Sequence, residues 1–552
     1  MKRERIISHL YQQIDNVVRR TLNGEQSFGQ TLTLVGDPYA SGKFALALSL
    51  LIENDPRRSA EWPEVWSTLA LAPCDNWGKY YFLQALLKLS QQGVLDKVFT
   101  ASQLQILRGK LHWQEMVDEG TWRLNPRFPT NFYGVAFSVA RLRYLLGWES
   151  ASASQEILLK LIEHYRAHAD NGCSDETNGH GRFDRYSVLL VAEICQRHLE
   201  TELEVADWLK ASLRQAVTLV LSILNEDGSG FQWGRSIGAY GDSAFNEILA
   251  VSLRLGLLTP WERKVASAFS LACSDRFLNF WYDRDEQSVN LWFKGRQTDA
   301  YRAEHRLVGE NISLCLQHLN VQQAWVGTAS SESVDVEKPQ LALEFTAFRK
   351  DQFVRGLYHW HDGRRTFVLP LINGANPYHN TSPYFPLPFS SGLFTGVAQG
   401  NAPLWLPGIR DDRGRLLRPL VWFSDCQHQQ TVSGWEIVID YDGLDVVEDG
   451  GEPVAEPQCE FAFHCRTRYL IEAGALTRED IFTCPLGRGV GVEFMAALYA
   501  NAPQLTLQGY DRIDYGTTAL CSPNGPLAQE VTASREISSQ SIFTVSWQVR
   551  YR

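Results

Sequence analysis

The densest group of residues that could do chemistry in this chain is the segment NEDGSGFQWGRSIGAYGDSAFNEILA, residues 225 to 250. It contains five glycines, Arg235, and Tyr240 framed by small residues. Glycines at this density let a ligand or another backbone segment approach closely. An arginine can pair with an anion, and a phenol can exchange a proton when nearby cations favour its phenolate. The segment is therefore the first candidate for a ligand site.

A second polar group lies in the glycine-rich segment DNGCSDETNGHGRFDRYSVLLVAEI, which runs into an apolar helix. Its candidate side chains are Asn178, His180, Arg182, Asp184 and Tyr186. Asn, His and Arg are groups that can neutralise a carboxylate on a ligand. The alternative is purely structural, because Asn favours turns and Asp184 suits the N-cap of the helix that follows.

Three further segments contribute polar or aromatic candidates, which are Asn131 and Tyr133, Arg302 and His305, and His379. The first pair begins an apolar helix, where the asparagine can equally be an N-cap and the tyrosine a core residue. The second pair can grip a carboxylate or can belong to a charged helix face. The last lies in a loop rich in Pro, Asn and aromatic residues, which can close over a cleft or serve only as a rigid connection.

Two patterns that can indicate a metal or a nucleotide are incomplete. His359 and His361 project from one face of a predicted strand, but no third metal ligand is evident nearby. The glycine-rich turn that ends in Lys43 has five residues between Gly36 and its Gly-Lys pair, and Phe44 follows. A P-loop needs four residues there and a Ser or Thr after the lysine. We therefore expect no cofactor, and a turn leading into an apolar helix.

The elements that must position these residues differ between the two parts of the chain. From residue 1 to about 325 the apolar residues recur at helical spacing, as in QEILLKLIEHYRAH. Residues 326–340 are small, polar and acidic, which is typical of a linker. From 341 to 552 the period is two, as in the final segment SIFTVSWQVRYR. We therefore predict a multidomain α+β protein with an N-terminal helical domain and a C-terminal antiparallel β-sandwich.

Composition restricts the classes of partner. The formal net charge of −11 argues against nucleic acid and against an anionic membrane surface. The 17 Trp, 20 Tyr and 27 Phe residues offer flat apolar faces, which suit sugar rings as well as cores. No run is long enough for a membrane span, the N-terminus has no export signal, and the ten cysteines form no CxxC pair. These features predict a cytoplasmic protein.

The segment DGS, then an aromatic residue and Gln, then GAYG before an apolar helix, resembles the active-site segment of hyaluronate and chondroitin lyases. The resemblance extends to the broader group of lyases, including heparinase-like enzymes, that have an (α/α) toroid followed by an antiparallel β-sandwich. Two departures stand out. Phe231, Gln232 and Trp233 replace the catalytic histidine of that family, and the spacing from DGS to Tyr240 is shorter.

The resemblance implies β-elimination at a uronic acid in an acidic oligosaccharide or polysaccharide, which leaves a 4,5-unsaturated uronate. It implies that Tyr240 moves the proton and that Asn178, His180 and Arg235 neutralise the carboxylate, with help from His379. It places Asn131, Tyr133 and Trp233 in the sugar platform. The other expected binding residues are Arg182, Tyr186, Arg302 and His305.

Two other function classes stay open. Helical toroids also serve inverting glycosidases, which need a carboxylic acid and a carboxylate about 6.5–9.5 Å apart. Asp184, Asp242 and Glu247 are available for that role. The third class is a carbohydrate-binding protein without catalysis, which the missing histidine favours. Only elimination produces a double bond in the product, so this bond distinguishes the lyase from both alternatives.

Overall fold

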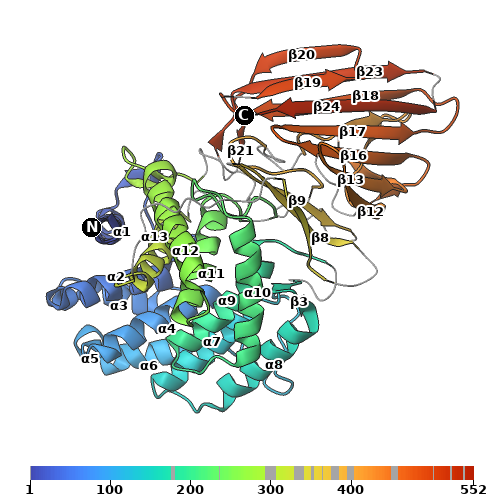
Figure 1. Cartoon of the computed structure of the whole chain (residues 1–552). Coiled ribbons are helices and arrows are strands. Elements are labelled where there is room, and N and C mark those ends of the chain that lie inside the picture. The colour runs from blue at the N-terminus through green and yellow to red at the C-terminus, as the bar shows by residue number, and fades with distance from the viewer. Residues whose placement is uncertain are drawn as a thin grey trace.

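The structure is a computed structural model, and it describes residues 2–175, 181–234, 236–291, 306–328, 341–349, 354–363, 365–373, 385–394, 403–448, 458–501, 503–522, 525–538 and 541–551. Helices occupy the first part of the chain and β-sheets the second, and the two parts are in contact (Figure 1). The predicted linker, residues 326–340, lies mostly outside the described residues.

The helical part contains thirteen described α-helices. They are α1 Lys2–Leu22, α2 Ala40–Asn54, α3 Pro63–Leu71, α4 Asn76–Gln91, α5 Leu95–Val98, α6 Ala101–Lys110, α7 Phe132–Leu145, α8 Ser152–His168, α9 Arg185–Glu200, α10 Asp207–Ser222, α11 Ala239–Arg254, α12 Pro260–Arg276 and α13 Leu307–Ala324. A 3₁₀ helix, Pro56–Ala60, follows α2, and a π-helical turn, Phe277–Trp281, extends α12. No helix in this part of the described chain is both long and apolar enough to cross a membrane.

Six of these helices form a closed inner ring. In chain order α2, α4, α7, α9, α11 and α13 each pack on the next, and α13 returns to pack on α2. Outer helices cover the ring, with α1 on α13, α8 on α7, α10 between α9 and α11, and α12 between α11 and α13. The alternation of inner and outer helices gives the ring two layers around a central axis.

The local sequence explains where several helices begin and why the inner ones pack closely. Asp184 caps α9, with its carboxylate accepting a hydrogen bond from the backbone N–H of Tyr186 at 2.8 Å, as expected for an N-cap. Helix α2 is buried from Ala40 to Ile52, because an inner helix contacts the protein on all sides. The predicted turn and apolar helix around Lys43 are confirmed.

The strand part contains three larger sheets, and the pairing between their strands is antiparallel throughout. Its strands are β7 Leu343–Ala347, β8 Arg355–Asp362, β9 Arg365–Ile372, β10 Gly408–Arg410, β11 Leu416–Arg418, β12 Phe423–Gln430, β13 Gly434–Tyr441, β14 Leu444–Val447, β15 Cys459–Glu460, β16 His464–Glu472, β17 Ala475–Thr483, β18 Val490–Leu498, β19 Gln504–Gln508, β20 Arg512–Thr517, β21 Cys521–Ser522, β22 Gly525–Pro526, β23 Gln529–Ile537 and β24 Ile542–Arg550. The helical part adds three short two-stranded pairs, which are Gln26–Ser27 with Gln30–Thr31, Ala169–Asp170 with Cys173–Ser174, and Tyr282–Asp283 with Ser288–Val289.

Two of the sheets pack against each other through aromatic side chains. One has the strand order β15-β14-β11-β10-β18-β23-β20 and the other β12-β13-β16-β17-β24-β19 (Figure 1). Trp405 contacts Trp547 of β24, with ring centres 5.5 Å apart, and Phe494 of β18, at 6.5 Å. The predicted alternation in the last strand is confirmed, because Phe543, Val545, Trp547, Val549 and Tyr551 are all buried.

The third sheet, β7-β8-β9, connects the helical part to the other two sheets (Figure 1). The imidazole of His361 on β8 contacts the carbonyl oxygen of Ser222 at the end of α10, with an N–O distance of 2.5 Å. The hydroxyl of Thr366 on β9 donates a hydrogen bond to the carbonyl oxygen of Leu224 at 2.8 Å. These contacts fix the sheet to one end of the helical ring.

Candidate active site

A pocket of about 350 Å³ lies inside the helical ring, and residues from all six inner helices line it. Its volume falls within the roughly 300–1,000 Å³ range of small-molecule and cofactor sites. Tyr240, the central residue of the sequence motif, is part of its lining. The pocket is therefore the cavity in which the chemistry of Tyr240 would take place.

Tyr240 lies in the first turn of α11 and makes polar contacts with two other inner helices. Its hydroxyl donates a hydrogen bond to the carboxylate of Glu310, in the first turn of α13. Its backbone carbonyl accepts a hydrogen bond from the guanidinium of Arg185, at the start of α9. Glu310 is fully buried and Tyr240 is 3% exposed, so the pair is shielded from bulk water. A phenol in contact with a buried carboxylate is an arrangement that can pass a proton.

The glycines around Tyr240 have a packing role that the structure makes clear. Gly238, which precedes α11, has a φ of +76°, in the left-handed region that favours glycine. A Cβ at Gly230 would lie 2.1 Å from the carbonyl oxygen of Gly241, so no larger residue fits there. The segment at Phe231 therefore lies directly against the first turn of α11, with a backbone hydrogen bond of 3.2 Å to Gly241.

Five cationic side chains line the same pocket, which are Lys43, Arg185, Arg197, Arg254 and Arg306. The guanidinium of Arg185 lies 5.5 Å from the centre of the Tyr240 ring. Lys43 and Arg306 both approach Asp37, at 4.0 Å and 3.5 Å, a carboxylate whose side chain is 1% exposed. Positive groups at the wall of a cavity raise the local concentration of anionic ligands. The pocket is thus suited to a ligand that carries a negative group near Tyr240.

An aromatic wall faces the cations from α4 and α7. Trp77 and Tyr81 on α4 have ring centres 6.3 Å apart, and both are only partly buried. Phe132 contacts Trp77 from α7, with ring centres 6.4 Å apart. These three side chains line the pocket. Their partly covered faces can stack on sugar rings.

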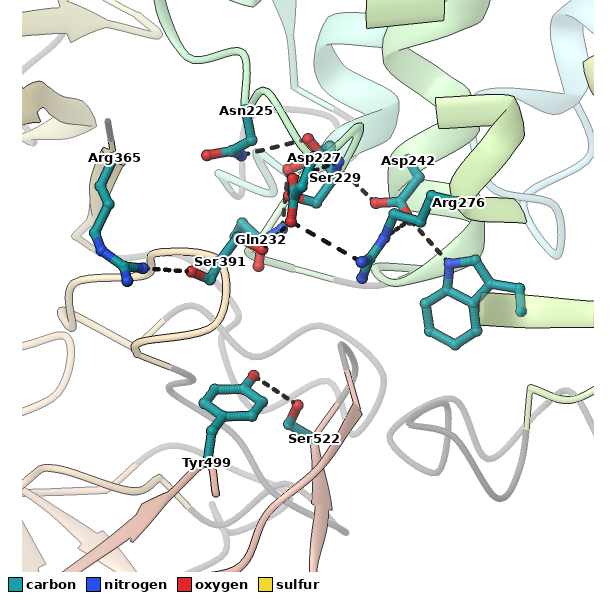
Figure 2. Close-up of polar contacts among 12 residues, drawn as sticks. Asn225, Asp227, Ser229, Gln232, Asp242, Arg276, Arg365, Ser391, Tyr499 and Ser522 are labelled. Atoms are coloured by element: carbon teal, nitrogen blue, oxygen red, sulfur yellow. Dashed lines mark hydrogen bonds and ion pairs between the residues drawn. The ribbon is translucent and has the colours of Figure 1, made fainter. Parts of the chain in front are cut away.

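The DGS part of the motif lies outside this pocket and connects the two parts of the protein (Figure 2). The carboxylate of Asp227 accepts hydrogen bonds from the hydroxyl of Ser229 at 2.6 Å and from that of Ser391 at 2.7 Å. Ser391 belongs to the segment after β9, so the contact joins the helical ring to the strand part. Arg276 of α12 also approaches Asp227, at 3.9 Å.

Asp242 has a structural role, in contrast to the catalytic role considered for a glycosidase. Its buried carboxylate accepts hydrogen bonds from the backbone of Gly230 at 2.8 Å, the indole of Trp281 at 2.9 Å and the guanidinium of Arg276 at 3.1 Å (Figure 2). Burial raises its pKa, while Arg276 opposes this shift. Asp184 caps α9, as described above, so of the three glycosidase candidates only Glu247 lines the pocket.

The structure describes six of the predicted site residues and brings three of them together. Tyr240, Asn131 and Tyr186 line the pocket. The other predicted residues, Asn178, His180, Arg235, Arg302, His305 and His379, lie outside the described residues and stay predictions.

The remaining three described residues support the structure and do not line the pocket. Trp233 is 1% exposed, donates a hydrogen bond from its indole to the carbonyl oxygen of Phe183 at 3.0 Å, and stacks on Phe348. The expectation that Trp233 forms a sugar platform is therefore corrected, since its ring is covered by protein. Tyr133 accepts a hydrogen bond from the backbone of Leu124 at 3.0 Å, and Arg182 is buried.

The two histidines considered as metal ligands contact other groups. His359 lies 3.3 Å from the hydroxyl of Thr346, and His361 contacts Ser222 and Thr366. Burial lowers the pKa of His359 to about 4. Within the described ranges, no group of three or more His, Cys, Asp and Glu side chains is arranged to hold a metal ion.

Sequence reasoning missed most of the pocket. The aromatic residues Trp77 and Tyr81 and the cations Lys43 and Arg185 were not among the expected site residues. The start of α4, NWGKYYF, could have indicated the aromatic part of the pocket, because several aromatic residues occur there at the N-terminus of a helix. Glu310 lies in the same segment as Arg302 and His305, for which the sequence left open a carboxylate-binding group or a charged helix face, and the structure buries Glu310 against Tyr240.

Comparisons with known proteins support the fold. No family model matches the chain, and neither does any curated protein. The structure is similar to that of a chondroitin AC lyase from Streptomyces coelicolor A3 in complex with chondroitin sulphate. The TM-score is 0.54 at 10% identity, and the match covers 99% of this chain and 79% of that one. A mutant of that enzyme gives the same TM-score, identity and coverage.

A heparan sulfate lyase from Pedobacter heparinus also matches, with a TM-score of 0.29, 9% identity and coverage of 98% of this chain and 83% of that one. The match to the chondroitin AC lyase shows that the chain has a polysaccharide-lyase-like fold, and the resemblance inferred from the GAYG segment is confirmed at the level of the fold.

Proposed function

We propose that this protein is a lyase that cleaves uronate-containing polysaccharides or oligosaccharides by β-elimination. The observation that carries the proposal is the hydrogen bond between the buried Glu310 and Tyr240, which lines a pocket with several cations, within a polysaccharide-lyase-like fold. The complex of the structurally similar chondroitin AC lyase with chondroitin sulphate supports an acidic polysaccharide as the substrate class.

The reaction places three demands on the pocket. The C5 proton of the uronate must be removed, a double bond must form between C4 and C5, and the C4–O bond must break while its oxygen gains a proton. The C5 proton becomes acidic only when the carboxylate beside it is neutralised. Arg185 and Arg306 line the pocket for this role, and Asn178, His180 and Arg235 are the residues predicted to assist.

The Tyr240–Glu310 pair can meet the two proton-transfer demands in sequence. Glu310 takes the phenol proton, and the nearby guanidinium of Arg185 favours the phenolate that results. The phenolate of Tyr240 removes the C5 proton. The re-formed phenol then donates this proton to the departing oxygen. Glu310 returns the first proton to Tyr240, which restores the starting state of the pair. The aromatic wall of Trp77 and Tyr81 would hold the sugar rings in place during these steps.

The test is a direct assay for the new double bond. Purified protein is incubated with a panel of uronate-containing polymers and oligomers, and the ultraviolet absorbance of the conjugated product is followed. We expect a rise with one substrate class and its loss in Tyr240→Phe, which retains the ring and removes the proton. New reducing ends without a rise in absorbance would instead establish hydrolysis, and neither signal with retained binding would establish a binding protein.

Two of the three carboxylates that the sequence offers to an inverting hydrolase are engaged in other roles. Asp184 caps a helix and Asp242 belongs to a buried hydrogen-bond network. Glu247 lines the pocket together with Glu193 and Glu200, and such an enzyme needs two carboxylates, so the assay for the double bond separates the two reactions.

A further inference from the structure

We propose that the end of the pocket around Glu247 is a subsite for a hexosamine ring whose amine is free and protonated. This inference rests on the proposed function, because it assigns the sugar next to the uronate that Tyr240 would act on. It concerns the binding of a second ring and gives Glu247 no part in proton transfer at C5.

Glu247 and Tyr240 share one face of α11. They are seven residues apart, which places them two turns apart and about 10 Å along the helix. Both side chains line the same pocket. A ligand whose uronate lies beside Tyr240 therefore extends along α11 toward Glu247, where a neighbouring sugar ring would lie.

One carboxylate oxygen of Glu247 is an acceptor without a donor in the part of the chain that the structure describes. This atom, Oε1, is also buried. A buried acceptor that is left unsatisfied costs free energy, and a donor on a ligand removes that cost. Burial raises the pKa of Glu247 to about 7, which shows how weakly its surroundings compensate the negative charge.

The charged groups that act on Glu247 come from α9 and are of both signs. Among them Arg185 has the largest effect and lowers the pKa of Glu247, as does Arg197, while Glu193 and Glu200 raise it. Arg197 is engaged elsewhere, because its guanidinium lies 3.0 Å from the carboxylate of Glu200 and also donates a hydrogen bond to the hydroxyl of Tyr80.

The other helices that face this end of the pocket present mostly uncharged groups. Gln317 and Asn320 of α13 and Gln84 and Tyr81 of α4 are part of the lining. Arg254, at the end of α11, is exposed and donates a hydrogen bond to Gln196 at 3.4 Å.

Different parts of the pocket therefore suit different groups on a ligand. Lys43 and Arg306 favour an anion near Tyr240, whereas the unsatisfied carboxylate oxygen of Glu247 suits a charged donor two turns further along α11, and Arg185 acts on both residues. A disaccharide of a uronate and a free-amine hexosamine carries these two charges on adjacent rings. An acetyl group on the nitrogen removes the positive charge, and a sulfo group replaces it with a negative one, which Glu247 would repel.

The experiment measures binding under conditions that prevent turnover. Tyr240→Phe protein is titrated by calorimetry at neutral pH with a saturated uronate–hexosamine disaccharide, either with a free amine or N-acetylated. We expect the free-amine form to bind roughly tenfold more tightly, as for one hydrogen bond between charged groups. Adding Glu247→Gln should remove most of this preference while the N-acetylated form keeps its affinity, and Glu247→Asp should retain part of it.

Glu163→Gln, at a glutamate whose side chain is 69% exposed, is the matched control and should retain the full preference. Equal affinity for the two disaccharides, or a preference that survives Glu247→Gln, would overturn the subsite. The two proposals fail separately. A protein that eliminates but shows no amine preference contradicts only the subsite, and one that binds the amine form selectively without eliminating contradicts only the lyase reaction.

Discussion

The hydroxyl of Tyr240 and the carboxylate of Glu310 meet between two neighbouring inner helices, in the first turn of α11 and the first turn of α13. Both side chains are buried, and the tyrosine is part of the pocket lining. Because α11 and α13 pack directly on each other, the distance between the phenol and its acceptor is fixed by the helical ring and does not depend on a loop.

The Tyr240–Glu310 contact predicts that Glu310→Gln slows the reaction without weakening binding. The amide keeps the size of the side chain but cannot take the phenol proton, so we expect kcat to fall by roughly 10²–10⁴-fold. The rate is measured from the absorbance of the double bond, and the Kd of a substrate analogue should stay within a few-fold of the wild-type value.

Ser313→Ala, one turn further along α13 and also in the pocket lining, is the control for a general disturbance of the helix. It should leave kcat nearly unchanged. If both variants lose the same activity, Glu310 has only a structural role.

The aromatic wall makes a second prediction, which separates two tryptophans. Trp77→Ala should weaken substrate binding by roughly ten- to a hundredfold, as for the loss of stacking on one ring, with a smaller effect on kcat. Trp233→Phe should leave the Kd unchanged and lower the free energy of unfolding by about 1 kcal/mol, because it removes a buried hydrogen bond. Calorimetric titration and urea unfolding of both variants provide the measurements. A loss of affinity in Trp233→Phe would restore the platform role first expected for that residue.

The sequence predicted the strands better than it predicted the residues that line the pocket. The strands were readable because one face is buried and the other is not, as in Phe543 and Val545 against Thr544 and Ser546. The inner helices are buried on nearly every side, so their sequence does not distinguish a residue that faces the cavity from one that faces another helix. The sequence likewise did not separate the two tryptophans: Trp77 lines the pocket, whereas Trp233 is covered by protein.

The motif around Tyr240 was informative for a different reason. Its glycines are needed because the backbones at Gly230 and Gly241 lie too close together for a side chain. Tyr240 directly precedes Gly241, so the glycine pattern pointed to the correct tyrosine. Glu310 could not be predicted as its partner, because the two residues are seventy positions apart and only the closure of the ring brings α11 and α13 together. The role of Asp184 was readable locally, since an N-cap depends on neighbouring residues alone.

The network around Asp242 makes a third prediction, which tests its structural role (Figure 2). In Asp242→Asn the new NH₂ group faces the donors of Arg276 and Trp281, and the guanidinium loses its buried counter-charge. We expect the free energy of unfolding to fall by roughly 3–5 kcal/mol, as for breaking a buried ion pair. Urea unfolding measures this change. Asp227→Asn is the control, and because the Asp227 carboxylate is more exposed, its free energy of unfolding should fall by less. Unchanged stability with lost glycoside hydrolysis would instead make Asp242 catalytic.

Glu247 makes the last prediction, which concerns the pH dependence of stability. Burial raises the pKa of its carboxyl from the usual 4.5 to about 7 in the folded protein. Between these two values the folded state holds a proton that the unfolded state has released. The contribution of Glu247 to the free energy of unfolding therefore decreases as the pH rises from 4.5 to 7, and it stays low above that range.

In Glu247→Gln this pH dependence is absent, because the amide does not titrate. The stability of the variant relative to the wild type should consequently increase between pH 5 and pH 8, by on the order of 1–3 kcal/mol. Urea unfolding of both proteins at the two pH values gives the difference, and Glu163→Gln should show no such change. A gap that is the same at pH 5 and pH 8 would mean that Glu247 ionises as freely in the pocket as in water, and the pocket would then lack the unsatisfied carboxylate on which amine binding depends.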